Sequence, residues 1–311
     1  MKTFNYDELF GGEDQPDEVK NENGYCQWSV MPNGVFLPAQ QTVKSLDAGL
    51  YEIKYDSSMG SYKMIKQELN ADELFFLPSG EIDGVIDDVK KFWDKIAVFR
   101  KYKYAHKRGI LLYGEPGCGK SCIIQLCMKH IIEEMDGIVI NVKDEDDVDS
   151  YIGFIHNFRK IEPLRPLIVI LEDLDSIMGE DRYTTSRVLN ILDGIKQIEN
   201  VVYIATTNYP EKLEERVTNR PSRFDRRYRV EKPSDEMRLA YFKHKIPAED
   251  IVNVDVERWV KDTKDMSLAH LREVVVSVIV LGNTYEETIT KLTDMKKKPK
   301  AKESGGLGFN K

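Results

Sequence analysis

The sequence predicts a three-layer α/β fold, in which helices cover both faces of a parallel sheet. Short apolar runs of strand length alternate along the chain with segments whose apolar residues recur at helical spacing. A strand that is apolar throughout is typical of a parallel sheet that is buried on both faces. A glycine-rich loop between the first run and a helix supports this fold. The runs are Gly109 to Tyr113, Gly137 to Val142, Leu167 to Leu171 and Val201 to Ala205.

Composition sets the class of protein. The chain has 311 residues, a formal net charge of −8 and 32% charged residues. This size allows one large domain and one or two small ones. No apolar run approaches the roughly 18–20 residues of a membrane span, and the N-terminus lacks a signal-peptide pattern, so we expect a soluble, cytoplasmic protein. The acidic balance argues against a surface that binds nucleic acid throughout.

Two segments precede the α/β domain, which we place at residues 81–233. Residues 1–24 are rich in Asp, Glu, Asn and Gly and predict an acidic disordered tail. Residues 25–80 predict a small β domain, which could be a packing module or a partner-recruiting domain. Its strands are expected over 34–38, 49–55, 62–66 and 73–77. A helix with an apolar stripe is then predicted over 85–99.

Gly114 to Ser121 matches the phosphate-binding pattern G-x-x-x-x-G-K-S/T at every fixed position. The preceding strand and the following helix give this phosphate loop its proper context, because backbone N–H groups and the helix N-terminus then surround a triphosphate. Lys120 would neutralise the β- and γ-phosphates, and Ser121 would bind Mg²⁺. The predicted nucleotide-binding residues of this segment are Gly114, Glu115, Pro116, Gly117, Cys118, Gly119, Lys120, Ser121 and Cys122.

Acidic residues follow the strand Leu167 to Leu171. Acids at the carboxyl end of a strand beside a phosphate loop hold Mg²⁺ and position water. We assign Glu172 to the metal and Asp173 to the attacking water. The next strand ends at Asn208, whose neutral amide could hold that water or the γ-phosphate.

Arg220 and Arg223 enclose a Pro-Ser turn after that strand. Arginine suits the charge that develops on a phosphoryl group in the transition state. The alternative is a surface loop held by salt bridges. From Pro233 the pattern becomes helical, which predicts a compact helical subdomain over 234–295. Residues 296–311 are rich in lysine and glycine and predict a flexible basic tail, either solvated or in contact with nucleic acid or a partner.

These four motifs, in this order and spacing, resemble those of the AAA ATPases over about residues 81–295. The resemblance implies that Asn208 is the sensor-1 residue, and that Arg220 and Arg223 are arginine fingers which act on the neighbouring subunit. The segment around Asp83 and Gly84 is similar to the family's adenine-side segment. The helical subdomain would then be the lid.

Further details refine the resemblance. His270 lies near the sensor-2 slot of the lid. The amino-acid sequences of 108–114, 116–121 and 171–173 are most similar to those of one branch of the family, that of the mitochondrial inserter of the Rieske iron–sulfur subunit. The transmembrane segment of that branch has no counterpart here, so its substrate does not carry over. Most members have Asp-Glu where this chain has Glu172-Asp173, which leaves the order of the metal and water roles open.

Members that thread proteins present an aromatic-aliphatic-glycine loop to the pore of the ring. Tyr151-Ile152-Gly153 matches this motif, although its distance along the chain from the acidic pair is shorter than we expect for members that thread proteins. An apolar stripe at helical spacing crosses the same segment, so a pore loop and a buried helix are equally supported. The stripe consists of Ile152, Ile155, Phe158 and Ile161.

Together these features predict Mg²⁺-dependent hydrolysis of ATP in a homo-oligomeric ring, a hexamer or alternatively a heptamer. The ring would remodel or translocate a macromolecular substrate, expected to be a protein. Two other functions stay open. One is a nucleic-acid-linked loader or remodelling ATPase that contacts nucleic acid through the basic tail. The other is a nucleotide-switched scaffold that hydrolyses slowly.

Overall fold

The computed structural model describes residues 27–31, 35–39, 42–58, 60–69, 80–178, 182–193, 198–213 and 222–296. The chain divides into two units, Met1–Leu46 and Asp47–Lys311. In the first unit, strands β1 (Gln27–Met31) and β2 (Val35–Ala39) form an antiparallel hairpin in which Gln27 pairs with Ala39. The other described elements belong to the second unit.

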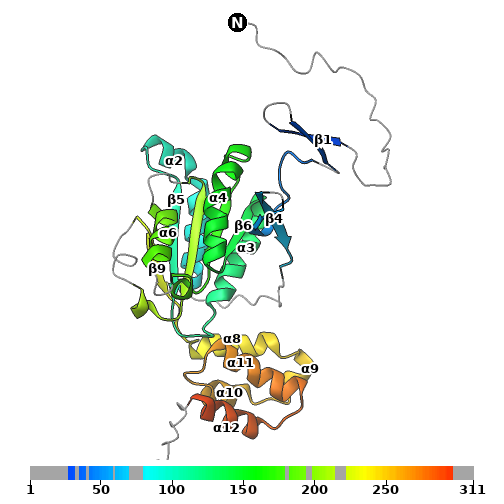
Figure 1. The fold of residues 1–311 in the computed structure, drawn as a ribbon. Helices are drawn as coiled ribbons and strands as arrows, with labels where there is room; N and C mark the ends of the chain where they lie inside the picture. The colour runs from blue at the N-terminus through cyan, green and yellow to red at the C-terminus, as the bar shows by residue number, and fades with distance from the viewer. Residues whose placement is uncertain are drawn as a thin grey trace, which may run out of the picture. The chain divides into compact units, whose positions relative to one another are not determined.

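A seven-stranded sheet organises the second unit, in the order β4-β3-β6-β7-β8-β5-β9 (Figure 1). Every neighbouring pair is parallel except β3 and β4, which form an antiparallel hairpin at one edge. The predicted α/β sheet is therefore confirmed, with one antiparallel strand added. The strands are β3 (Gly49–Asp56), β4 (Ser61–Gln67), β5 (Lys107–Tyr113), β6 (Ile138–Val142), β7 (Leu167–Leu171), β8 (Val201–Thr207) and β9 (Arg226–Arg229).

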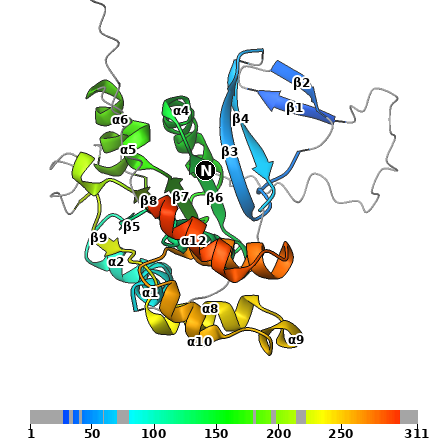
Figure 2. The ribbon, with the colours of Figure 1, turned by 90° about the horizontal axis from the view of Figure 1, so that it is seen from below.

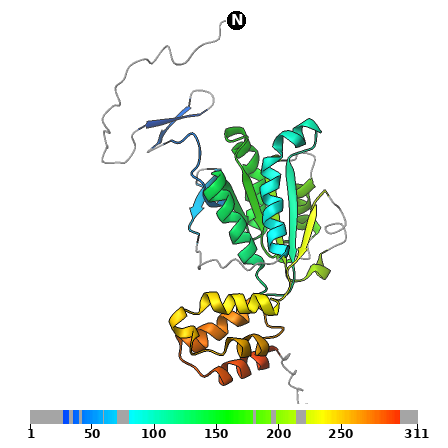
Figure 3. The same ribbon diagram turned by 180° about the vertical axis from the view of Figure 1, so that it is seen from behind.

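Helices cover both faces of this sheet (Figures 1 and 3). Side chains such as Ile110, Val139 and Ile168 face α1 (Gly80–Asp94) and α3 (Lys120–Met135), with which they form the main core. The side chains that alternate with these along the strands point to the other face of the sheet. There they face α4 (Glu145–Ile161), which packs on β3 and β6. Burial on both faces explains why the central strands are apolar throughout. The smaller helices of this part are α2 (Ile96–Lys101), α5 (Leu174–Met178), α6 (Arg182–Asp193) and the 3₁₀ turn η3 (Pro210–Lys212).

The small β domain predicted over 25–80 is wrong as a single unit. β1 and β2 form the separate hairpin of the first unit, whereas β3 and β4 extend the main sheet. β3 pairs with β6 because Tyr51 and Ile53, which alternate along it, are buried against α4. Only a long-range contact decides this, and local strand pattern does not reveal it. The predicted strand at 73–77, the acidic tail and the basic tail beyond Lys296 lie outside the described residues.

The helix predicted over 85–99 is two helices, because α1 ends at Asp94 and α2 begins at Ile96. Lys95 lies between them with φ −105° and ψ 11°. The predicted stripe is in the core, as Phe92 stacks on the buried ring of His106 at a centroid distance of 3.9 Å.

A compact group of helices follows the sheet (Figure 2), in the part of the chain where the sequence pattern is helical. Ser234 caps the first of them by accepting a hydrogen bond from the backbone N of Met237. Phe242 packs edge-on against Trp259, which stacks on Tyr285. None of the described helices is long and apolar enough to cross a lipid bilayer. The elements are α8 (Asp235–Lys245), α9 (Ala248–Ile251), α10 (Val256–Asp262), α11 (Leu268–Val275), the π-helical η4 (Val276–Val280) and α12 (Tyr285–Lys296).

Tyr151 lies inside α4 and is 1% exposed. Its hydroxyl group shares a hydrogen bond of 3.1 Å with that of Tyr203 on β8. Of the two alternatives for this segment, the buried helix is confirmed and the pore loop is wrong. The buried stripe keeps the two middle residues of the predicted one but not its ends, because Ile152 and Ile161 are 36% and 68% exposed. Its buried members are Val148, Tyr151, Ile155 and Phe158.

Candidate functional site

The phosphate loop connects the carboxyl end of β5 to α3. Gly114, Gly117 and Gly119 have φ values of 152°, 74° and 108°, a region that favours glycine. A Cβ atom on Gly114 would lie 2.2 Å from the carbonyl O of Val230, so a side chain there is excluded. α3 begins at Lys120 without a side-chain cap, which leaves its first N–H groups for an anionic ligand.

Lys120 is buried and folded over the loop. Its Nζ donates hydrogen bonds of 2.7 Å and 3.0 Å to the carbonyl oxygens of Gly114 and Glu115. Burial lowers the pKa of Lys120, while the charges of Cys118, Asp173 and Asp175 oppose this effect. The cation is therefore held by neutral carbonyl groups, with carboxylates close enough to act on its charge.

Asp173 and Asn208 meet at the carboxyl edge of the sheet. Asn208 Nδ2 donates a hydrogen bond of 3.1 Å to Asp173 Oδ1. The backbone N of Asp173 donates a hydrogen bond of 3.0 Å to Thr206 Oγ1. The backbone of Asp173 has a φ of 49°, which turns the chain away from the strand. The side chain of Asp173 is exposed. The predicted sensor amide and the predicted water-positioning acid are therefore in direct contact.

Glu172 is half-buried beside this pair. Burial raises the pKa of Glu172, the charge of Asp173 adds to this effect, and the charge of Lys143 opposes it. Leu171 pairs with Ala205 of β8, so the next residue, Glu172, stands beside Thr206. Ile170, two residues earlier, belongs to the core under α3. Alternation along the strand therefore places Glu172 on the face that carries the phosphate loop.

Asp175 is a further residue of the site, to which the sequence analysis assigned no role. Its Oδ1 accepts a hydrogen bond of 2.6 Å from Oγ1 of Thr207, which is fully buried. The same Oγ1 accepts from the backbone N of Tyr209 at 3.0 Å. Asp175 also acts on the charge of Lys120. Its position two residues after Asp173 could have indicated a role in the site. The direction of its side chain, however, depends on α5 starting at Leu174.

Residues of the helical group reach the phosphate loop. The backbone N of Ala269 donates a hydrogen bond of 3.2 Å to the carbonyl O of Gly117. His270 Nδ1 lies 2.7 Å from Ser267 Oγ, and that oxygen would contact any Cβ placed on Gly117. His270 is therefore connected to the loop through Ser267, and its sensor-2 role stays a prediction.

An ion pair joins the phosphate loop to the segment that connects β9 with the helical group. Lys232 Nζ lies 2.6 Å from Oε2 of Glu115. Hydrogen bonding to Glu115 raises the pKa of Lys232. Cys118 is buried in the loop, whereas Ser121 and Cys122 are exposed in the first turn of α3.

Asp83 and Gly84 lie in the first turns of α1. Asp83 is exposed, and the carbonyl O of Gly84 accepts a hydrogen bond of 3.2 Å from the hydroxyl of Tyr228 on β9. This contact ties α1 to the edge of the sheet. A role of the segment on the adenine side of a nucleotide stays a prediction.

Arg223 lies at the amino end of β5, and Arg220 lies outside the described residues. A Cβ atom on Gly109 would be only 1.8 Å from the carbonyl O of Arg223, so the two backbones are in contact. Gly109 and Gly114 are separated along β5 by about 16 Å at ~3.3 Å per residue. Arg223 is 8% exposed, and its Nε donates a hydrogen bond of 3.0 Å to Asp193 Oδ2. It therefore lies far from the phosphate loop of its own chain.

The donor set fits a nucleoside triphosphate with Mg²⁺. The loop supplies N–H groups and a lysine, while the hydroxyl of Ser121 and the carboxylate of Glu172 are oxygen ligands of the kind that Mg²⁺ prefers. Within the described ranges, no group of three or more His, Cys, Asp and Glu side chains could hold a metal. A magnesium ion would thus need phosphate oxygens to complete its ligands, as is usual in nucleotide sites.

Comparison with known proteins gives a consistent result. Residues 110–232 match the model of the ATPase family associated with various cellular activities (AAA). A cell division cycle protein 48 homolog of Archaeoglobus fulgidus is 28% identical over 192 residues, which are 57% of this chain and 26% of that protein. An AAA ATPase forming ring-shaped complexes, from Corynebacterium diphtheriae, is 28% identical over 180 residues, 51% of this chain and 35% of that protein.

A third relative is matched over a longer part of the chain. The proteasome-activating nucleotidase of Methanococcus vannielii is 25% identical over 268 residues, which are 76% of this chain and 65% of that protein. The first two relatives, by contrast, are covered over only about a quarter to a third of their own length.

Proposed function

We propose that this chain, which carries an AAA ATPase domain, hydrolyses ATP with Mg²⁺ in a ring of identical subunits. The observation that carries the proposal is the phosphate loop, in which three glycines adopt positive φ values and Lys120 is held by the carbonyl oxygens of Gly114 and Glu115. Bound Mg²⁺·ATP would supply the γ-phosphoryl group that a water molecule attacks. All other steps belong to residues of the chain.

The chain's own residues divide the work as follows. N–H groups of the phosphate loop and the Lys120 ammonium bind the phosphates, and Ser121 and Glu172 hold the metal. Asn208 donates to one oxygen of Asp173, which leaves the second oxygen to accept a proton from the attacking water. Asp173 is exposed, so water reaches it without a change in the core.

The ring completes the site. Arg223 is too far from the phosphate loop of its own chain, so the phosphates that it could stabilise are those of a neighbour. In the single chain its guanidinium is paired with Asp193, and it would have to leave this partner to act as a finger. Relatives are named as forming ring-shaped complexes, which supports the same assembly. A hexamer, or alternatively a heptamer, stays our prediction for the ring.

The substrate is expected to be a protein that the ring remodels or translocates. A relative named as a proteasome-activating nucleotidase supports this class. The Tyr151 segment gives it no support, because that side chain is buried. The resemblance to the Rieske-inserter branch and a cytoplasmic location also stay predictions from the sequence.

A nucleic-acid-linked ATPase is a second candidate, favoured by one surface segment. Arg100 to Tyr104 are exposed in succession, with Tyr102 and Tyr104 at 63% and 70%. No acidic residue occurs between Lys95 and Lys107. Cations interleaved with exposed rings suit single-stranded nucleic acid. Salt-sensitive stimulation of ATP hydrolysis by single-stranded DNA, lost on changing both tyrosines to alanine, would favour this candidate over protein remodelling.

The test of the proposed function is nucleotide binding by Lys120→Ala. This change removes the cation held in the loop, so we expect ATP affinity measured by calorimetry to fall below detection. Lys129→Ala is the matched control, since Lys129 is an exposed lysine of the same helix. Equal ATP affinity in the two variants would contradict the proposed site.

A further inference from the structure

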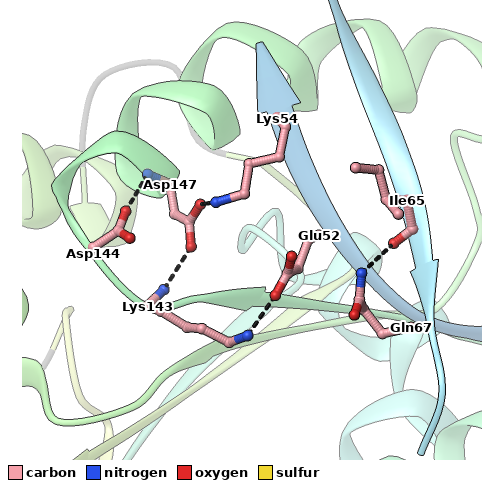
Figure 4. A network of polar contacts seen from close by, with 7 residues as sticks. All are labelled: Glu52, Lys54, Ile65, Gln67, Lys143, Asp144 and Asp147. Atoms are coloured by element: carbon pink, nitrogen blue, oxygen red, sulfur yellow. Dashed lines mark hydrogen bonds and ion pairs between the residues drawn. The ribbon is translucent and has the colours of Figure 1, made fainter. Parts of the chain in front are cut away.

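Two ion pairs fasten strand β3 to the turn after β6 and to the first turn of α4 (Figure 4). Lys143 Nζ bonds to Glu52 Oε1, and Lys54 Nζ bonds to Asp147 Oδ1. Oδ2 of Asp147 also accepts a hydrogen bond of 3.1 Å from the backbone N of Lys143. The two pairs therefore start from alternate residues of β3, Glu52 and Lys54, and end on neighbouring parts of the chain, the turn after β6 and the first turn of α4.

Strand register places Lys143 beside the candidate metal ligand. β6 and β7 are parallel neighbours in which Val142 pairs with Leu171. Lys143 and Glu172 are the first residues after this last pair, so their backbones leave the sheet from adjacent strands, which lie about 4.8 Å apart. This distance is within the reach of a lysine side chain, which is half-exposed here.

The three groups also share a face of the sheet. Leu50, Val139 and Ile170 pack in or against the core under α3. Alternation along the strands then puts Glu52, Lys143 and Glu172 on that same face, which also carries the phosphate loop. In agreement with this placement, the charge of Lys143 lowers the pKa of Glu172 against the larger effects of burial and Asp173. The ammonium group is thus paired with the carboxylate on the hairpin, while its charge also acts on the carboxylate in the site.

We propose that Lys143 is a positioning residue shared between Glu52 and Glu172, and that the hairpin β3–β4 decides which carboxylate holds it. While Glu52 holds the ammonium group, Glu172 is left to the magnesium ion of the nucleotide. When Glu52 withdraws, the ammonium group pairs with Glu172 and competes with the metal, because both are cations that need the same oxygens. This inference rests on the proposed function, since it requires Glu172 as a metal ligand.

The place of the hairpin suits such a control. β4 ends the sheet and pairs with β3 alone among the described strands, and most of its side chains are exposed or half-exposed. β3 begins three residues after the boundary of the first unit, at Gly49. A molecule that binds the hairpin, or a pull on the first unit, would therefore act on the strand that carries Glu52.

The experiment compares Glu52→Gln with Lys54→Met, which breaks the second ion pair of the same strand and serves as the matched control. The full chain is titrated with Mg²⁺ while the binding of a fluorescent ATP analogue is followed. We expect Glu52→Gln to raise the Mg²⁺ concentration at half-maximal binding about twofold to fivefold, the range of an exposed ion pair. Lys54→Met should leave it unchanged, and Lys143→Met should not raise it. The double variant Glu52→Gln/Lys143→Met should behave as Lys143→Met.

A purely structural role predicts otherwise. If Glu52→Gln and Lys54→Met shift the Mg²⁺ requirement alike, or if Lys143→Met raises it as Glu52→Gln does, the inference is wrong. If Glu52→Gln does not fold, variants of the half-exposed Lys143 provide the test. Lys143→Arg must retain the wild-type Mg²⁺ concentration at half-maximal binding, and Lys143→Met must not exceed that concentration, even when Mg²⁺ is limiting. Absence of Mg²⁺-dependent binding in the wild-type chain would instead contradict the proposed function itself.

Discussion

The two ends of strand β5 are built alike but hold their cations differently. Near each end a glycine meets a backbone carbonyl so closely that a side chain is excluded. The oxygen of Val230 faces Gly114 at the carboxyl end, and that of Arg223 faces Gly109 at the amino end. A buried cation lies at each end, Lys120 at the first and Arg223 at the second.

The partners of the two cations differ in charge. Lys120 is held by neutral carbonyl oxygens, which leave its charge for an anionic ligand. Arg223 is paired with the carboxylate of Asp193, which neutralises it inside the chain. We infer that the carboxyl end is a site ready to bind nucleotide, whereas the amino end keeps an arginine in reserve for another chain's site.

Asp173→Asn sharpens the account of the carboxyl end and carries the larger effect. The variant keeps the shape of the side chain and its contact with Asn208, but it loses the basic oxygen. We expect ATP binding to persist while hydrolysis at saturating Mg²⁺ falls by about 10²–10⁴-fold. Phosphate release and nucleotide binding are measured on the same preparation.

Glu172→Gln is the companion variant. It should raise the Mg²⁺ requirement and leave more of the turnover once Mg²⁺ is saturating, because its carboxylate is assigned to the metal. The assignments are reversed if Glu172→Gln abolishes turnover at saturating Mg²⁺ while Asp173→Asn is mild. The inverted order of this acid pair is the feature that makes the comparison necessary.

Asp193→Asn tests the amino end and carries a smaller effect. The amide keeps a hydrogen-bond acceptor for Arg223 but removes the opposite charge, so we expect the dilute chain to lose about 1–3 kcal/mol of unfolding free energy. If Arg223 is held in reserve, activity at ring-forming concentration should be kept or increased. Denaturant unfolding and phosphate release separate the two quantities, and a parallel loss of both would indicate a structural pair only.

Local motifs made the carboxyl end predictable from the sequence. The phosphate loop contains its own glycines, lysine and helix start within a few residues, so its context was visible. The positions of Asp173 and Asn208 after two apolar strands were also visible, although their contact was not predicted. The family model that covers 110–232 includes both of these segments.

The sequence could not reveal features that depend on distant partners. β3 reads as a strand, but its place beside β6 depends on the burial of Tyr51 and Ile53 against α4. Tyr151 belongs to a segment that matches a pore-loop motif. Only the contact of its hydroxyl group with that of Tyr203 shows that Tyr151 lies in the core. A salt-bridged loop was one of the two alternatives for Arg223, but its partner Asp193 was invisible, because the two residues come from separate elements.

The central claim, that each site is completed by a neighbour, is tested by mixing two inactive variants. Lys120→Ala subunits keep Arg223 but lack a working phosphate loop, and Arg223→Ala subunits keep the loop but lack that arginine. A finger supplied by a neighbour is worth about 10³–10⁵ in rate in well-studied systems. We therefore expect each variant alone to be nearly inactive, and mixed rings to recover part of the wild-type phosphate release. No recovery in rings verified to contain both variants, or full activity of a dilute wild-type monomer, would contradict the account.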